Sequence, residues 1–175
     1  RGVDRQPIFF ARENWGFFIQ RMHQYFQPQY VDVIAYCLMP NHYHILVYIK
    51  VDDEFGTRVM QPFGTSYVKA VNRYKKRIGP LFQGRYKAKL VDSGQYLHTL
   101  TRYIHLNPVC ARLVDDPADW PYSSYLDYVG LRNGQLPKPD IILEQFETRD
   151  SYRKFVLDQQ DEIQSLKNIR PFLFD

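Results

Sequence analysis

The sequence predicts an α+β fold in which helices cover an antiparallel β-sheet. Residues 31–50 have the alternation and the central turn of a β-hairpin, and stretches with apolar residues at helical spacing flank them. The expected order is helix, strand, strand, helix, strand, helix, which is nearly a split βαβ arrangement. One strand is missing at the front of this order, so we expect it upstream of Arg1 or absent from this chain.

Residues 13–26 are expected to form the first helix, because apolar residues recur there near helical spacing and a proline lies beyond the end. Residues 31–39 alternate loosely and are β-branched early, which predicts a strand. The tetrapeptide MPNH at residues 39–42 predicts a tight turn, since the fixed φ of proline suits its second position. Residues 42–50 then form the second strand of the hairpin.

A loop is expected at residues 52–57, and a second helix at residues 62–78, which Gly79 and Pro80 would end. Its apolar stripe is predicted to consist of Phe63, Tyr67, Val71, Tyr74 and Ile78.

Residues 84–91 alternate basic and other side chains, which predicts a strand with one solvated, positive face. Ser93 is suited to cap a third helix from residue 95 to about residue 107, and Pro108 would help to end it.

The stretch 130–139 is rich in glycine and proline and is typical of a connector. Residues 141–165 are expected to form one or two helices. We therefore expect a catalytic domain at residues 1–130, followed by a connector and a C-terminal helical appendage at residues 131–175.

The composition limits the location and the partners of the chain. Its apolar runs are far too short to span a bilayer, and we expect neither a signal peptide nor a membrane partner. Cys37 and Cys110 fit no zinc spacing and no disulfide framework, which favours a reducing compartment, the cytoplasm. A net charge of +4 and a pI near 9.0 permit an acidic partner without requiring one.

Basic residues recur between residues 69 and 89 with no acidic residue among them, and aromatic residues are interleaved. Basic groups neutralise phosphates and aromatic faces stack on unpaired bases, so this pattern favours nucleic acid, single strands included. The alternative is a solvated helix face followed by a polar strand, although such faces usually mix both signs. The side chains expected to contact phosphates are Lys69, Arg73, Lys76, Arg85, Lys87 and Lys89.

Two histidines, His42 and His44, stand one residue apart in the apolar stretch CLMPNHYHILVYI. In a strand they would share one face, because side chains alternate with a period of two. The other face would carry the core residues Tyr43, Ile45, Val47 and Ile49. The two imidazoles are either two thirds of a metal site or ordinary polar residues at the start of a strand.

The third helix, with the sequence QYLHTLTRYIHLNP, places Tyr103 and Asn107 four residues apart on one face, with Tyr96 near the same line. If this helix lies over the histidine face, His42, His44 and Asn107 could hold a divalent ion, with Tyr103 one turn away. The alternative is that Tyr103 is a core aromatic residue and Asn107 a helix C-cap.

These residue types suit chemistry on a phosphodiester. A metal ion bound to a non-bridging oxygen polarises the phosphorus atom and offsets the developing charge. Neutral imidazoles and an amide oxygen leave the ion its full charge and open positions. Tyrosine is a workable nucleophile whose phenolate can also leave, so a covalent step can be reversed.

Four motifs in this order resemble the single-tyrosine HUH transposases, and most of all the REP-associated tyrosine transposases of the IS200-like family. They are CLMPNHYHILV, LFQGRYKAKLV, YLHTLTRYIHLNPVCARLV and WPYSSY, and the likeness covers about residues 4–128. The resemblance implies a ferredoxin-like split βαβ fold of the HUH endonuclease type, with an antiparallel sheet and helices on both faces.

Enzymes of that family cleave single-stranded DNA next to imperfect hairpins, form a 5′-phosphotyrosine link and release a 3′-OH. By resemblance, His42 and His44 match the metal ligands, Tyr103 the nucleophile and Asn107 the third ligand. The resemblance further implies Mg²⁺ or Mn²⁺ as cofactor, and single-stranded DNA and REP-like hairpins as partners. It implies a monomer or homodimer associated with the nucleoid of a bacterial cytoplasm.

The sequence departs from the family pattern at Cys110, where the family usually has arginine, and this would weaken a DNA contact. Tyr43 is bulkier than the usual aliphatic residue between the two histidines, and we expect it to point into the core. The remaining histidines are expected to be structural or surface residues; they are His23, His98 and His105.

Two other functions compete with a DNA cleaving and joining enzyme. A hairpin-binding regulatory protein could keep the fold and do no chemistry, although intact His42, His44, Tyr103 and Asn107 argue against it. A small metallohydrolase would need acidic residues around its metal, which the motifs lack.

Overall fold

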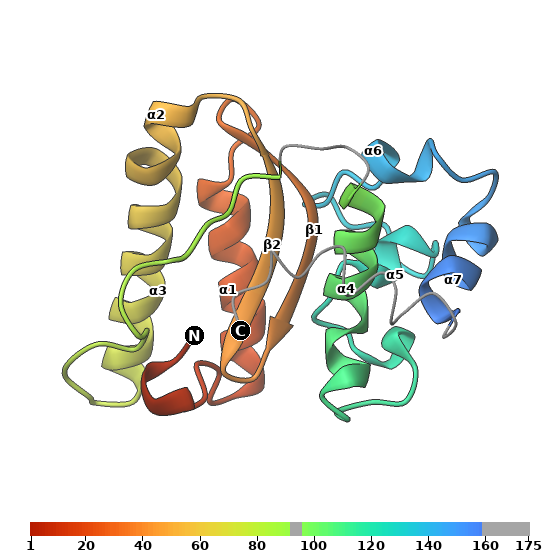
Figure 1. Cartoon of the computed structure of the whole chain (residues 1–175). Coiled ribbons are helices and arrows are strands. Elements are labelled where there is room, and N and C mark those ends of the chain that lie inside the picture. The colour runs from red at the N-terminus through yellow and green to blue at the C-terminus, as the bar shows by residue number, and fades with distance from the viewer. Residues whose placement is uncertain (92–95, 159–175) are drawn as a thin grey trace. The chain divides into compact units, whose positions relative to one another are not determined.

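The computed structural model describes residues 1–91 and 96–158 (Figure 1). Its elements are η1 (Val3–Arg5), α1 (Arg12–Tyr25), β1 (Val31–Met39), β2 (His42–Ile49), α2 (Asp52–Glu54), η2 (Phe55–Met60), α3 (Gln61–Tyr74), α4 (Leu97–Cys110), η4 (Pro117–Asp119), α5 (Tyr125–Tyr128), α6 (Asp140–Leu143) and α7 (Arg149–Leu157). Within the described residues the sheet has two strands, which form the β1–β2 hairpin. The predicted α+β class is thus confirmed at the level of mixed helices and an antiparallel sheet.

The chain divides into two compact units, and both take residues from the hairpin. The first unit comprises Arg1–Val33, Leu38–Tyr43 and Val47–Tyr86, and the second comprises Ile34–Cys37, His44–Leu46 and Lys87–Asp175. The predicted division near residue 130 is a different one, and it stays a prediction.

The first helix and the hairpin confirm the local sequence patterns to within one residue at each end. The side chain of Asn14 stabilises the start of α1, because its Oδ1 accepts hydrogen bonds from the backbone N–H groups of Phe10 and Ala11 at 3.0 and 3.1 Å. These bonds satisfy two backbone donors near the helix start that would otherwise lack partners.

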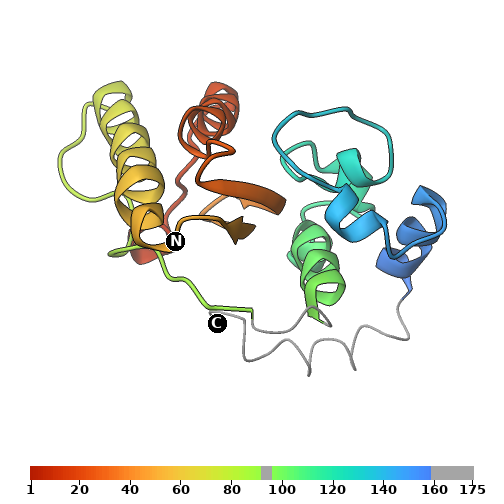
Figure 2. The ribbon, with the colours of Figure 1, turned by 90° about the horizontal axis from the view of Figure 1, so that it is seen from above.

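An aromatic core holds the first unit together. Helices α1 and α3 lie side by side (Figures 1 and 2). Phe18 of α1 is fully buried, and its ring centroid lies 4.8 Å from those of Phe63 and Tyr67 on α3. Tyr43 of β2 contacts Phe18 from the hairpin at 5.2 Å. The expectation that Tyr43 points into a core is therefore confirmed.

Hydrogen bonds connect the segment that precedes α1 to α3 and to the turn of the hairpin. Tyr67 donates its buried O–H to the carbonyl of Ile8 at 2.7 Å, and the N–H of Ile8 donates to the carbonyl of Pro40 at 2.9 Å. The turn of the hairpin is thereby connected to α3 through one residue, Ile8.

The predicted strand at residues 84–91 is wrong, because these described residues form no ladder. Pairing in this region consists of an isolated antiparallel bridge between Gly2 and Phe82. A strand requires a neighbour whose N–H and C=O groups face its own. Alternation of basic and other residues cannot supply that neighbour.

The predicted loop at residues 52–57 is also wrong, since α2, η2 and α3 follow one another without a break. The second helix then stops at Tyr74, before the end that Gly79 and Pro80 suggested. As a result Tyr74 is 61% exposed and Ile78 is 99% exposed, and neither belongs to the apolar stripe.

A Schellman motif explains this early end. Lys76 has a positive φ of 49°, and the N–H of Arg77 donates to the carbonyl of Asn72 at 2.9 Å. This closure satisfies a helix carbonyl and turns the chain away from the axis. It occupies the left-handed region with a lysine, although glycine is the usual residue there.

Helix α4 also ends in a Schellman motif. The prediction that Pro108 would help to end it is wrong. Pro108 lies inside the helix, where a proline removes one N–H donor. The chain leaves the helix at Arg112, whose φ is 55°, and the N–H of Leu113 donates to the carbonyl of Pro108 at 2.9 Å.

The second unit has its own core between α4, α5, α6 and α7 (Figure 2). Its fully buried members are Tyr125, Tyr128, Ile142, Tyr152 and Val156, and Ile34 of β1 joins them. The predicted C-terminal helices are confirmed as α6 and α7, while residues 159–165 of that prediction lie outside the described residues. Gln95 and the predicted cap Ser93 also lie outside them.

Across the described ranges, no helix combines the length and the apolar character that crossing a bilayer requires.

Replacing Phe18 with alanine tests the aromatic core. We expect the free energy of unfolding to fall by about 3–5 kcal/mol, because a fully buried ring is removed and a cavity is left. Urea denaturation followed by circular dichroism measures the loss. The control Tyr74→Ala, at a side chain that is 61% exposed, should cost less than about 0.5 kcal/mol. Similar losses in the two variants would contradict the packing described here.

Candidate active site

The first predicted ligand, His42, begins β2 and is half-buried in the first unit. Its Nδ1 lies 2.7 Å from Oδ1 of Asn41. An amide oxygen only accepts hydrogen bonds, so Nδ1 carries the proton in this contact and the lone pair lies on Nε2. A hydrogen bond at one ring nitrogen is the usual way in which a protein orients the other nitrogen toward a metal.

The second predicted ligand, His44, and the predicted nucleophile, Tyr103, contact each other within the second unit. Their ring centroids lie 5.7 Å apart, and the rings meet edge to face at 83°. β2 supplies the imidazole and α4 supplies the phenol. The sequence hypothesis that this helix lies over the histidine strand is therefore supported at His44.

Asn107 lies one turn after Tyr103 on α4, and its amide is held by the helix itself. Its Nδ2 donates to the backbone carbonyl of Tyr103 at 2.8 Å. Because the amide nitrogen is used in this way, the oxygen Oδ1 is the atom with which Asn107 can bind a cation. The alternative role of Asn107 as a helix C-cap does not apply, since α4 continues to Cys110.

The donor set of His42, His44 and Asn107 fits a divalent cation in chemical type: two imidazole nitrogens and one amide oxygen. In the part of the chain that the structure describes, no three His, Cys, Asp or Glu side chains gather into a metal-binding group. A site built on these residues therefore requires the amide oxygen of Asn107.

On another side of α4, His105 is fully buried and uses both ring nitrogens. Nε2 lies 2.8 Å from Oγ of Ser124, and Nδ1 lies 2.7 Å from the hydroxyl of Tyr152. Both partners are hydroxyl groups, which can donate or accept, so a neutral ring satisfies both contacts by donating from one nitrogen and accepting at the other. Burial lowers the pKa of His105 to about 3, which keeps the ring neutral at physiological pH. The prediction of a structural histidine is confirmed.

Ser124 also gives β1 a partner along one edge. Its backbone N–H donates to the carbonyl of Tyr36 at 2.9 Å, and its Oγ accepts from the N–H of Tyr36 at 2.9 Å. Ser124 lies in the WPYSSY motif. The sequence marked this motif, but it did not show that its serine joins β1 to the helix that carries Tyr103.

The beginning of the predicted connector is folded against the same motif, because Arg132 donates to the carbonyls of Pro121 and Ser123 at 2.8 and 2.5 Å. Asp127 is buried and forms an ion pair with Arg132 at 2.6 Å, and the N–H of Gly134 donates to Asp127 at 2.7 Å. This ion pair was not identified from the sequence, because the composition of residues 130–139 indicates only a turn-rich segment.

The six basic side chains predicted to contact phosphates are all exposed. Lys69 and Arg73 lie on α3, and Lys76, Arg85, Lys87 and Lys89 lie after it. Lys87 and Lys89 belong to the second unit, and the other four belong to the first. Two other cations of this stretch make internal contacts: Lys75 lies 5.1 Å from the ring of Phe10, and Arg77 donates to the carbonyl of Pro80.

Two other tyrosines of the sequence, Tyr43 and Tyr96, are alternative candidates to Tyr103 as the nucleophile. Burial raises the pKa of Tyr43 to about 12, which makes its phenol a poor nucleophile. Tyr96 is half-buried at the residue that precedes α4.

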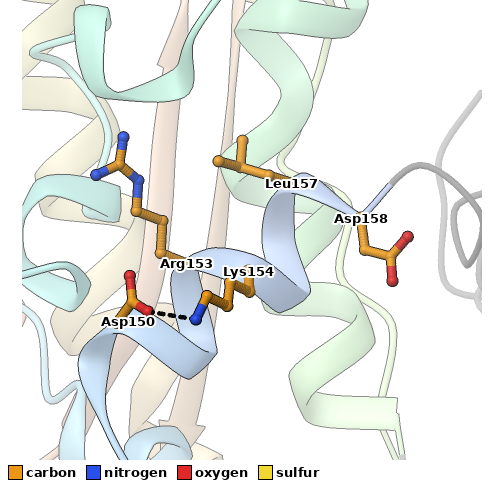
Figure 3. A pocket seen from close by; sticks show the side chains of 5 residues that line it. All are labelled: Asp150, Arg153, Lys154, Leu157 and Asp158. Atoms are coloured by element: carbon orange, nitrogen blue, oxygen red, sulfur yellow. Dashed lines mark ion pairs between the residues drawn. The ribbon is translucent and has the colours of Figure 1, made fainter.

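A surface pocket lies elsewhere, along α7 (Figure 3). It is lined by Asp150, Arg153, Lys154, Leu157 and Asp158. Asp150 and Lys154 pair at 2.8 Å across one helical turn, and their side chains are mostly exposed. No predicted site residue lines this pocket, so we do not regard it as the functional site.

Comparison with known proteins gives a family match that includes the residues of the candidate active site. The family model described as "Transposase IS200 like" matches residues 4–107, which include both histidines, Tyr103 and Asn107. A protein of Haemophilus influenzae named "Putative REP-associated tyrosine transposase" is 29% identical over 104 residues, which cover 54% of this chain and 58% of that protein. No solved structure matches the chain significantly. The resemblance indicated by the sequence motifs is confirmed.

Replacing Tyr152 with phenylalanine tests the anchoring of α4. The variant leaves the buried Nδ1 of His105 without its hydrogen bond, so we expect the free energy of unfolding to fall by about 1–3 kcal/mol. Urea denaturation measures it, with Tyr48→Phe as the control at a side chain that is 60% exposed. If both variants unfold at the wild-type urea concentration, the hydrogen bond does not stabilise the unit.

Proposed function

Because this chain belongs to the family of IS200-like transposases, we propose that it cleaves and rejoins single-stranded DNA next to hairpins through a covalent link to Tyr103. The contact between Tyr103 and His44 supports this most directly, since a phenol and an imidazole from distant segments meet at one place. The chain spans little more than half the length of its REP-associated relative. The hairpin substrate is carried over from the family resemblance.

The proposed cleavage exchanges one phosphodiester for another. The phenolate oxygen of Tyr103 forms a bond to phosphorus while the bond from phosphorus to the 3′ oxygen breaks. That oxygen takes up a proton and leaves as a free 3′-OH, and the 5′ end stays attached to Tyr103. Joining is the reverse exchange: an incoming 3′-OH loses its proton, attacks phosphorus and displaces the phenolate.

We assign His42, His44 and Asn107 as the residues that hold Mg²⁺ or Mn²⁺. Nδ1 of His42 donates a hydrogen bond to Oδ1 of Asn41, and the amide of Asn107 donates to the carbonyl of Tyr103. These hydrogen bonds support the role, because each orients the atom that would bind the ion. When bound, the ion polarises the phosphate and offsets its developing negative charge. The protein side chains hold the strand so that the phenol of Tyr103 faces phosphorus.

The exposed basic residues are proposed to bind the backbone of the DNA. They are Lys69, Arg73, Lys76, Arg85, Lys87 and Lys89. Their charges contact phosphates without reading the base sequence, and exposed Tyr74 and Tyr86 are available to stack on unpaired bases.

The remaining finer features follow from the family. We propose a ferredoxin-like split βαβ fold of the HUH type, with helices on both faces of the sheet, and a monomer or homodimer as the active species. The proposed substrate places the protein at the nucleoid, in the cytoplasm.

Replacing Tyr103 with phenylalanine tests the nucleophile. With metal and single-stranded hairpin DNA, the wild-type chain should give a protein–DNA adduct that resists denaturant and a free 3′-OH, and Tyr103→Phe should give neither. Tyr96→Phe is the matched control at the residue that precedes the same helix, and it should retain both products. An adduct that peptide mapping locates at another residue would refute the assignment, and binding without an adduct in the wild type would favour a regulatory hairpin-binding protein.

Replacing both His42 and His44 with alanine tests the metal ligands. The double variant should lose Mn²⁺ binding, measured by titration calorimetry, and cleavage should fall below detection, since two of three donors are gone. Its circular dichroism spectrum should match the wild type, because both side chains are only half-buried. His23→Ala removes an exposed histidine from α1 and should change neither quantity. Unfolding of the double variant would instead assign the two histidines a structural role.

The salt dependence of DNA binding tests the basic residues. The affinity for a hairpin with a single-stranded flank should fall steeply with salt, and each removed phosphate contact should reduce the slope by about 0.7. Lys69→Gln and Arg73→Gln should each show this reduction in a fluorescence anisotropy titration. Lys138→Gln removes an exposed charge outside the set and should leave the slope unchanged. A wild-type affinity that is independent of salt would remove all six residues from the interface.

A further inference from the structure

Arg102, the residue before Tyr103, is a buried cation whose hydrogen bonding is incomplete. Its side chain is 2% exposed. Nε donates to the carbonyl of Val156 at a long 3.3 Å, and the guanidinium lies 5.2 Å from the ring centroid of Phe155. Among the described residues, its buried Nη1 has no hydrogen-bond partner.

His98, on the same face of α4, has a second buried nitrogen whose hydrogen bonding is incomplete. It lies four residues before Arg102, so the two side chains are neighbours along the helix. Its Nδ1 is buried and likewise lacks a hydrogen-bond partner within the described part of the chain. The ring of Phe155 lies 5.7 Å from that of His98, so one aromatic side chain of α7 contacts both residues.

Leaving these groups unsatisfied is unfavourable. A buried donor without a partner gives up its hydrogen bonds to water and gains none in return, and the cost is greater when the group is charged. None of the ion pairs between described residues includes Arg102. A guanidinium and an imidazole N–H on one face, walled by an aromatic ring, suit an oxyanion that accepts from both.

We propose that His98 and Arg102 form a binding site for a phosphate group, beside Tyr103 on α4. Arginine matches phosphate because its planar fork donates two parallel hydrogen bonds. His98 and Phe155 are half-buried beside the fully buried Arg102. Burial lowers the pKa of His98, so its ring is neutral in the empty site and donates one N–H to the anion.

Two sources can supply this phosphate: free inorganic phosphate, or the strand held at Tyr103. The second source rests on the proposed function, whereas the chemistry of the site does not. Arg102 directly precedes Tyr103 in the helix, with its side chain about 100° away around the axis, so a strand that is held at Tyr103 and passes around the helix brings a second phosphate to Arg102. In that case the site helps to hold the strand in register for attack.

The test uses the full chain carrying Tyr103→Phe, so that no covalent chemistry intervenes. Inorganic phosphate is titrated against the chain at constant ionic strength, and binding is followed by the NMR signals of arginine Nε–H groups and histidine rings. We expect saturable shifts at Arg102 and His98. Arg102→Gln should weaken binding at least tenfold, and His98→Leu, which keeps an apolar contact with Phe155, at least threefold.

Arg112→Gln is the matched control, since it removes an exposed arginine just beyond the same helix and should leave the affinity within twofold. His98→Leu also protects the test if Arg102→Gln does not fold. Unsaturable shifts, or an affinity that neither variant changes, would overturn the site.

A second arm distinguishes the sources by adding a single-stranded oligonucleotide. If DNA supplies the phosphate, the Arg102 signal moves and no longer responds to inorganic phosphate; if both ligands bind together, the site takes free phosphate. Both results support a phosphate site. Failure of the wild-type chain to form an adduct would refute the proposed cleavage and leave this result unchanged.

Discussion

The hydrogen bonds of one buried imidazole organise the second unit. His105 joins α4 to α7 through Tyr152 and to the WPYSSY segment through Ser124, and Ser124 in turn pairs with Tyr36 of β1. Three elements that are distant in sequence are thereby held at fixed positions around one helix. A neutral ring satisfies both contacts at once because it donates from one nitrogen and accepts at the other.

For the proposed function, the consequence is that α4 is anchored through the face that carries His105, while Tyr103 lies on another face. Residues 103 and 105 lie about 200° apart around a helix, so the anchor leaves the phenol of Tyr103 on a different face. Asn107 follows Tyr103 after about one turn, while Arg102 and His98 lie on a third side toward α7. Anchoring, proposed chemistry and the proposed phosphate site therefore share one rigid element.

The first unit is stabilised in a different way. Its core consists of aromatic rings from α1, α3 and β2 that meet edge to face, such as Phe18 with Tyr67 and Phe63. Aromatic pairs in this geometry add to the stability that burial alone provides. Because the apolar side of α3 faces this core, its other side is left to exposed cations such as Lys69 and Arg73.

The sequence by itself determined α1, the β-hairpin and the identity of the candidate residues His42, His44, Tyr103 and Asn107. Each depends on side chains that repeat with the period of one helix or strand, or on motifs read in order along the chain.

Only the tertiary structure decided what the buried polar groups contact. The partners of His105 are 19 and 47 residues away from it, and no local pattern encodes such a distance. The ends of α3 and α4 also differ from the ends that glycine and proline residues predicted. Backbone hydrogen bonds around Lys76 and Arg112, which have a positive φ, determine where these helices end. The predicted strand at residues 84–91 did not form, because a strand exists only where a second backbone pairs with it.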